Sequence, residues 1–323
     1  MTTRLLLPLV TCLAFASGCQ IPKALTAPSE EEQVEIERKR ELPTEFRCYS
    51  LEFDHEAKER PRPRQEAYDR VEFNFTGSRE LPQSLGAEAP THVFVVVHGW
   101  MNNTISSQQF ASRWVNGIRA RAQPGEKPAF VSLHWDSERL VFHESAMTAT
   151  KLGKRRIAPL LQALRKAAPG ARIAVIGHSL GARAMISALH HSSERFADSA
   201  LLVEGAADVD WLHDDMRSAG ERVSRVANVY SVHDGVLENA YANAMQAKAL
   251  GRIGAERAPG VPFVRFELSA TFASNDFQAA LSAENSVAAG GSRVVNVDAS
   301  SVVTGHTDID HDALYDLAWA VTR

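Results

Sequence analysis

Several features that mark particular classes of protein are missing from this sequence or scarce in it. The 35 basic residues are outnumbered by 39 acidic ones, for a formal net charge of −4. No basic face stands out, which argues against a nucleic-acid partner. The 12 histidines do not have the spacing of metal ligands, so we predict neither a metal nor another cofactor. We find no internal repeat and no apolar run long enough to span a bilayer comfortably.

The first apolar stretch of the chain, Leu5 to Phe15, has the length of a signal-peptide core. It leads into Ala-Ser-Gly-Cys at residues 16–19, which resembles the lipobox of bacterial lipoproteins. That resemblance implies cleavage before Cys19 and membrane attachment through lipid on Cys19, with ordinary secretion as the alternative. Gln20, in place of aspartate, resembles an outer-membrane address. We therefore expect a lipid-anchored protein of the bacterial cell envelope that faces the periplasm.

Cysteine is scarce, with three residues in the whole chain. If Cys12 leaves with the signal peptide and Cys19 carries lipid, Cys48 is left alone and no intramolecular disulfide is available. Residues 19–45 are rich in charge and have no sustained apolar face, which is typical of a tether without a fold of its own. The predicted organisation is a signal peptide at residues 1–18, a tether at residues 19–45 and one folded domain at residues 46–323.

Candidate strands alternate with helical patterns beyond residue 45. This alternation predicts an α/β fold with a mostly parallel central sheet and helices on both faces. Two segments of alternating polarity, Phe46–Phe53 and Arg70–Phe75, are predicted as half-exposed edge strands. The other candidate strands are Thr91–Val97, Ala129–Trp135, Ala171–Ile176, Ala200–Gly205, Val226–Ser231 and Arg293–Val297. Helical patterns occur around Ser107–Ala122, Ile157–Leu164 and Leu314–Val321.

A pentapeptide, Gly-His-Ser-Leu-Gly at residues 177–181, lies between the apolar segment Ala171–Ile176 and a helical pattern. A serine in so tight a strand-to-helix turn needs small neighbours, which Gly177 and Gly181 supply. The N-terminus of the helix behind Ser179 is suited to stabilise an oxyanion. We therefore predict that Ser179 is a nucleophile. The buried face of the helix is predicted from apolar residues at intervals of three and four, Ala182, Met185, Ile186 and Leu189.

A second signal lies upstream, where the uninterrupted apolar run Thr91–Val97 ends in His98-Gly99. With the serine pentapeptide, this dipeptide resembles the α/β-hydrolase superfamily, over roughly Val71 to the C-terminus. Trp135–Ser137 and Ala207–Asp210 are similar to an esterase-like bacterial branch of it. The resemblance implies the chain order oxyanion loop, nucleophile, acid and histidine. It also implies an oxyanion hole formed by backbone N–H groups of Leu180, Gly99 and Trp100.

The acid and the base must follow Ser179, because a serine hydroxyl needs a histidine oriented by a carboxylate. Asp234, just after the candidate strand Val226–Ser231, matches the acid position of the superfamily. Asp208 and Asp210 are rivals, although an aspartate that closes a strand commonly caps the next element.

For the base, His306 lies in a Gly-His loop just past the last candidate strand and matches the superfamily pattern. His311, in or near the first turn of the following helix, is the alternative base. The histidines His98, His178 and His233 are better explained as architectural residues of the loops in which they lie.

These observations predict a cofactor-free serine hydrolase that cleaves carboxylic esters, of small molecules or lipids, through an acyl-enzyme. Thioesterase or amidase activity on the same triad, or a non-catalytic binding protein of the cell envelope, are the alternatives. Two long insertions, residues 211–225 and 238–292, could shape substrate choice. The second contains phenylalanines that either line an acyl pocket or belong to the core, namely Phe263, Phe266, Phe272 and Phe277.

Overall fold

The computed structural model describes residues 46–60, 64–138, 141–211, 217–257, 263–272, 274–283 and 293–323. The expected signal peptide, the tether and Cys19 lie outside the described residues, as do parts of both insertions. Among the described helices, none combines the length and the apolar character needed to cross a membrane.

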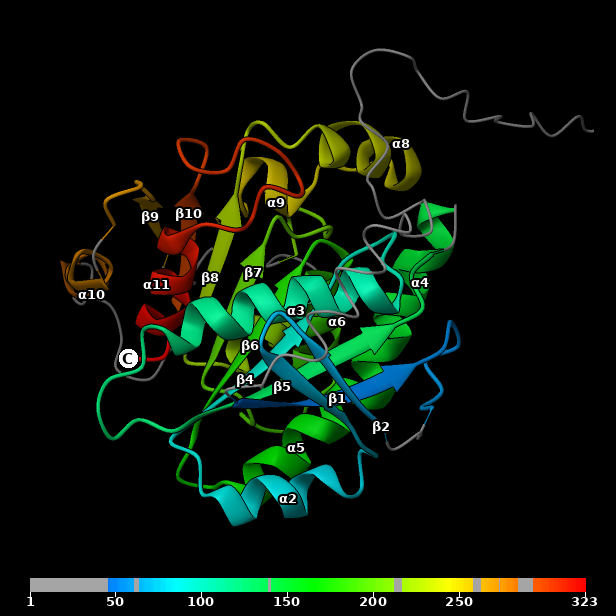
Figure 1. Ribbon diagram of the computed structural model, residues 1–323. Helices are drawn as coiled ribbons and strands as arrows, with labels where there is room; N and C mark the ends of the chain where they lie inside the picture. Colours follow the sequence, from blue (N-terminus) through cyan, green and yellow to red (C-terminus); the bar gives the residue numbers. More distant parts are fainter. Residues whose placement is uncertain are drawn as a thin grey trace, which may run out of the picture.

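The described part of the chain forms a ten-stranded sheet with the order β2-β3-β1-β5-β4-β6-β7-β8-β10-β9 (Figure 1). All neighbouring strands are parallel except β2 and β3. The strands are β1 (Phe46–Phe53), β2 (Arg64–Tyr68), β3 (Val71–Phe75), β4 (His92–Val97), β5 (Pro128–Trp135), β6 (Arg172–His178), β7 (Ser199–Val203), β8 (Arg225–Tyr230), β9 (Phe263–Glu267) and β10 (Arg293–Asp298).

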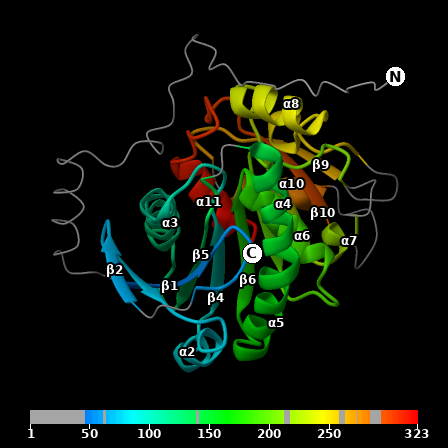
Figure 2. The same cartoon turned by 90° about the vertical axis from the view of Figure 1, so that its right-hand side faces the viewer.

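Helices cover both faces of the sheet, and the predicted α/β fold is confirmed. Figure 2 shows α3 and α11 on one side of the central strands and α4, α5 and α6 on the other. Each face has its own apolar cluster. The helices are α2 (Leu81–Glu88), α3 (Thr104–Arg119), α4 (Phe142–Leu152), α5 (Ala158–Ala167), α6 (Leu180–His190), α7 (Arg217–Glu221), α8 (Ala242–Met245), α9 (Leu250–Ile253), α10 (Ser274–Ala283) and α11 (Asp312–Ala320). Two π-helical turns, η2 (Gly153–Ile157) and η3 (Leu237–Tyr241), precede α5 and α8.

The sheet centre consists of the strands with the most continuous apolar sequence. Every residue of β4 is buried, and β6 is buried from Ile173 onward. These two strands pair with each other. A strand that is buried on both faces needs apolar side chains at successive positions, which is the pattern these two segments have.

The prediction that Phe46–Phe53 and Arg70–Phe75 are edge strands is wrong. β1 pairs with β3 on one side and β5 on the other, and β3 is covered by the antiparallel β2. The edges are β2 and β9, which the sequence analysis missed. Both are five residues long and carry charged side chains, as exposed edges commonly do, so neither has a strong apolar signal.

The parallel arrangement brings the carboxyl ends of β4, β6, β7, β8 and β10 to one edge of the sheet. Loops that follow such strand ends are the usual location of ligand and catalytic sites in open α/β sheets. In this chain they carry residues 98–103, 179, 204–211, 231–236 and 299–311. Each predicted site residue of the domain lies in, or directly beside, one of these loops.

Candidate active site

Ser179 occupies the tight turn between β6 and α6 that the sequence pattern predicts. Its backbone has φ 55° and ψ −121°, a conformation that costs a residue other than glycine about 1–3 kcal/mol. The flanking glycines permit it. A Cβ on Gly177 would lie 2.6 Å from the backbone nitrogen of Ala182, and a Cβ on Gly181 would lie 2.3 Å from the Val97 carbonyl oxygen. The turn thus holds the serine at the carboxyl edge of the sheet.

Ser179, His306 and Asp234 lie in hydrogen-bond contact. Ser179 Oγ is 2.9 Å from His306 Nε2, and His306 Nδ1 is 2.6 Å from Asp234 Oδ2. Asp234 is fully buried, and its other oxygen accepts the backbone N–H of Leu237 at 2.8 Å. Because a carboxylate only accepts, the Nδ1 of His306 carries the proton and Nε2 is free to accept from the Ser179 hydroxyl.

The loop that carries His306 is held in place on two sides. The N–H and the hydroxyl of Thr304 donate to Asp308 Oδ2 at 3.0 and 2.6 Å, and the Asp308 N–H donates to the Gly305 carbonyl. From β6, His178 Nε2–H donates to the His306 carbonyl at 2.8 Å. Burial lowers the pKa of His178 to about 3, so this imidazole is a neutral hydrogen-bond donor.

The alternative acids and the alternative base have other partners. Asp208 accepts the hydroxyl of Tyr241 at 2.5 Å, and Asp210 is exposed. His311 precedes the first residue of α11, and its Nε2 lies 3.0 Å from Asp308 Oδ1. The structure therefore brings Asp234 and His306 to the serine and leaves the three competitors outside this hydrogen-bonded group.

His98 shapes the loop after β4. Its Nε2 accepts the backbone N–H of Trp135 at 3.0 Å, so its Nδ1 carries the proton and donates to the Gly99 carbonyl at 2.9 Å. The indole of Trp135 donates in turn to the His98 carbonyl at 3.0 Å. Burial lowers the pKa of His98 to about 4, which keeps the ring neutral. These contacts agree with the architectural role expected for His98.

The backbone expected to form an oxyanion hole lies against the serine. A Cβ on Gly99 would lie 2.6 Å from Ser179 Cβ, so the chain after His98 directly contacts the elbow. Leu180 is the first residue of α6, and the first N–H groups of a helix have no partner within it. Trp100, the third predicted member, lines the adjoining pocket.

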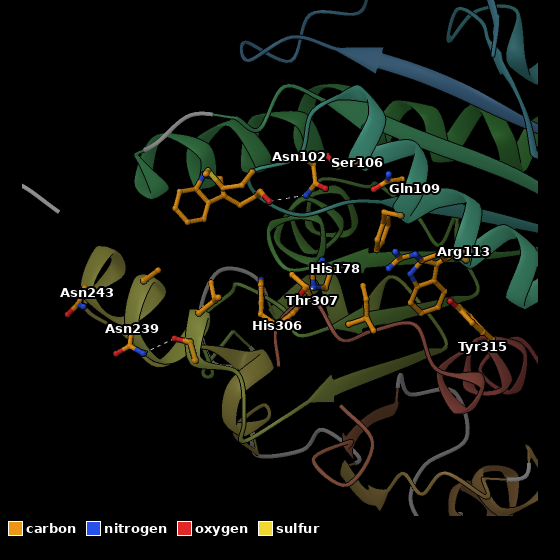
Figure 3. Close-up of a pocket in the computed structure, with 18 residues that line it drawn as sticks. Asn102, Ser106, Gln109, Arg113, His178, Asn239, Asn243, His306, Thr307 and Tyr315 are labelled. Atoms are coloured by element: carbon orange, nitrogen blue, oxygen red, sulfur yellow. Dashed lines mark hydrogen bonds between the residues drawn. The ribbon is translucent and has the colours of Figure 1, made fainter. Parts of the chain in front are cut away.

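A pocket of about 740 Å³ lies beside His306. In Figure 3, His306, His178 and Thr307 lie between Asn239 and Asn243 on one side and Arg113 and Tyr315 on the other. Ser179 itself is almost fully buried, so its contact with the pocket is through His306. Most of the apolar side chains that line the pocket come from the loop after β4, α3 and the C-terminal segment, namely Trp100, Met101, Phe110, Trp114, Ile309 and Tyr315.

The four phenylalanines of the second insertion do not line this pocket. Phe266 contacts both Phe272 and Phe277 beside β9 and α10, and Phe277 is fully buried in the cluster that includes α11. Phe263 packs against the cluster on the opposite face. The sequence left open whether these phenylalanines line an acyl pocket or belong to the hydrophobic core, and the structure supports the core.

Glu204 is the residue of this edge that the sequence analysis missed. Together with His178 and His306 it offers ligand atoms within 4.8 Å of one another, the one such group in the described ranges. Histidine spacing could not reveal this group, because its members lie at or after the ends of three different strands. The ring nitrogens involved already make hydrogen bonds to the His306 carbonyl, Asp234 and Ser179, and we infer no metal chemistry from it.

Comparison with known proteins gives one family. The sequence model of a family described as "Alpha/beta hydrolase of unknown function (DUF900)" matches residues 74–291. No curated protein matches the chain. The match covers more than half of the chain, including Ser179 and Asp234, and agrees with the sheet order and the strand-to-helix serine turn. The chain belongs to this α/β-hydrolase family.

Proposed function

We propose that this protein is a serine hydrolase that cleaves carboxylic esters through an acyl-enzyme intermediate. One observation carries the proposal: a strained turn presents Ser179 Oγ to His306 Nε2, and His306 Nδ1 is paired with the buried Asp234. An activated nucleophile requires a base within hydrogen-bond reach and a third group that orients the base.

The proposed reaction needs no group beyond the chain and water. As Ser179 Oγ bonds to the ester carbonyl carbon, its proton passes to His306 Nε2 and the carbonyl π electrons move onto the oxygen. The N–H groups of Leu180, Gly99 and Trp100 would stabilise this oxyanion. When the intermediate collapses, the alcohol leaves with the proton from His306. Water then attacks the acyl-enzyme by the same steps, with His306 as base.

The pocket supports an ester with a sizeable apolar group as the substrate. Its volume of about 740 Å³ falls in the range of pockets that enclose drug-sized ligands. Aromatic and aliphatic side chains form much of its wall, with amides of Asn102, Gln109, Asn239 and Asn243 among them. Among the described residues that line it, Arg113 is the one with a permanent charge.

A panel of p-nitrophenyl esters of increasing acyl length tests this function. We expect purified protein to hydrolyse them. We expect Ala240→Phe, in the pocket wall, to lower kcat/KM about tenfold for long chains but little for acetate, because the added ring takes space that a long acyl chain would fill, and such steric changes in a hydrophobic pocket are worth about 1–3 kcal/mol. Ala120→Phe, at the exposed alanine that directly follows α3 and lies outside the pocket, is the control. A wild type that cleaves no ester contradicts the proposed reaction. Preference for the corresponding thioesters or anilides would replace it with thioesterase or amidase activity.

We also propose that Cys19 is the site of lipid attachment and that the domain is held at the bacterial envelope. Support comes from the sequence of residues 16–20. Cys19→Ala is expected to abolish incorporation of a palmitate analogue and to release the protein from membranes, because several acyl chains together anchor a protein firmly. Cys48→Ala, at the buried cysteine of β1, is the matched control. Unchanged lipid labelling of Cys19→Ala would favour simple secretion.

A further inference from the structure

Glu204 is a buried carboxyl group that the proposed mechanism does not use. It directly follows β7, at the same edge of the sheet as Ser179 and Asp234, and it is fully buried. Its backbone φ is 44°, in the left-handed region that costs a residue other than glycine about 1–3 kcal/mol and is concentrated at functional sites. A charged residue in such a place needs a physical explanation.

The surroundings of Glu204 lack hydrogen-bond donors. No N–H or O–H group of the described residues reaches either of its carboxyl oxygens. His178 Nε2 is 3.7 Å from Glu204 Oε2, but its proton is donated to the His306 carbonyl. A carboxyl oxygen of Glu204 and a ring nitrogen of His306 lie within 4.8 Å of each other, and His306 Nδ1 in turn contacts Asp234 at 2.6 Å. The neighbouring side chain that acts on Glu204 is therefore itself an acid, Asp234, and both carboxyl groups are fully buried.

Only one of these two carboxyl groups can be ionised, since two adjacent buried carboxylates repel each other and are both deprived of hydration. Asp234 is stabilised as the anion, because the Leu237 N–H and the His306 Nδ1–H both donate to it. Glu204 receives no comparable stabilisation. The proton shared by the pair therefore belongs to Glu204.

The other titratable groups around Glu204 favour the same state. Burial raises the pKa of Glu204 well above its ordinary value, and the charges of Asp234 and Asp308 raise it further. His178 supplies no opposing positive charge, because burial lowers its pKa to about 3. His306 is the remaining neighbour, and its two ring nitrogens face Asp234 and Ser179.

We propose that Glu204 is a neutral carboxylic acid that donates its proton in a hydrogen bond to Asp234 and so positions the acid of the triad. This inference rests on the proposed function. Glu204 is a positioning residue, because it acts on Asp234 and is not among the residues that line the pocket. With a donor on each side, Asp234 keeps its charge and its orientation toward His306 Nδ1.

Two variants of similar size test the positioning role. Glu204→Gln keeps a neutral donor, so kcat, KM and the acid limb of kcat/KM against pH are expected to stay close to wild type. Glu204→Leu removes the donor and is expected to lower kcat about tenfold with KM unchanged, in line with the typical effect of a hydrogen bond to a charged group. A wild-type kcat for Glu204→Leu would overturn the proposed positioning role. The role would also be overturned if Glu204→Gln shifted the acid limb of the kcat/KM profile to lower pH. Such a shift would mean that the substitution removed a negative charge beside His306, and therefore that Glu204 is ionised in the wild type.

Stability tests the proton independently of catalysis. On unfolding above its ordinary pKa of 4.5, a protonated Glu204 releases its proton, so wild-type stability falls as pH rises. Neither variant has this proton to release. In urea unfolding at pH 5 to 8, the ratio of wild-type to Glu204→Gln unfolding constants is therefore expected to rise about tenfold per pH unit, until the folded-state pKa is reached.

The two measurements separate the possible failures. A ratio of unfolding constants that does not change with pH means that Glu204 is ionised in the folded protein, and this result overturns the inference whether or not the enzyme is active. If the ratio rises as expected but wild type hydrolyses no ester, thioester or anilide, the proposed function fails and the positioning role fails with it. Only the rising ratio together with the difference between glutamine and leucine in kcat supports the whole inference.

Discussion

Ser179→Ala is expected to lower kcat/KM at least about a thousandfold on any ester that the wild type hydrolyses, because the residual rate comes from binding and the oxyanion hole alone. Alanine has no Oγ to form the acyl-enzyme, yet it keeps the Cβ that contacts Gly99. The free energy of unfolding should therefore change little. Steady-state kinetics and urea unfolding of the same preparation measure both quantities.

Ser187→Ala is a matched control for this loss. Ser187 is a buried serine of α6, the helix that begins directly after Ser179, and its hydroxyl donates to the Thr150 carbonyl at 2.9 Å. Its removal should lower the free energy of unfolding by about 1 kcal/mol and leave kcat/KM close to wild type. If Ser179→Ala turned over substrate at the wild-type rate, another group would be the nucleophile.

His306→Ala is expected to lower kcat/KM at least about a thousandfold as well, because no other base contacts Ser179 in the described structure. His311→Ala should cost about twofold to fivefold. Its ring contacts Asp308 in a partly exposed pair, and such pairs contribute little. Kinetics of the two variants on one short-chain ester compare them. An inactive His311 variant beside an active His306 variant would reverse the two roles.

The clustering of the principal candidate residues could be predicted because each lies at or after the end of a strand with a strong apolar pattern. Val97, His178, Tyr230 and Asp298 end β4, β6, β8 and β10, which the sequence located to within one or two residues. Once these strands are taken as parallel, their following loops must meet at one edge. The parallel arrangement alone therefore predicts that the loops after these four strands lie together.

Glu204 could not be predicted in the same way. It continues the apolar run of β7, where the sequence analysis included it in the strand. Its meaning depends on Asp234 and His178, which lie at the ends of two other strands. A single acidic residue at the end of an apolar strand is the one signal that the sequence offers, and capping explains it equally well.

The sheet edges and the pocket wall were missed for a related reason. The alternation of apolar and polar residues in the sequence of β3 corresponds to alternating buried and half-buried side chains. Such a pattern in β1 or β3 does not indicate whether a further strand pairs with its outer side. The pocket wall combines Trp100 with residues of α3, η3 and α11. Helix α3 contributes five of these residues, η3 two and α11 one, so the wall is assembled from separate segments and none of them alone has a pocket signature.

The most direct test of the central claim is to find where a fluorophosphonate probe binds. The probe forms a covalent bond with an activated serine, and peptide mass spectrometry identifies the labelled residue. We expect one adduct on wild type, at Ser179, and its loss in Ser179→Ala and in His306→Ala, where the base is absent. An adduct on a different serine, or equal labelling of wild type and Ser179→Ala, would contradict the account.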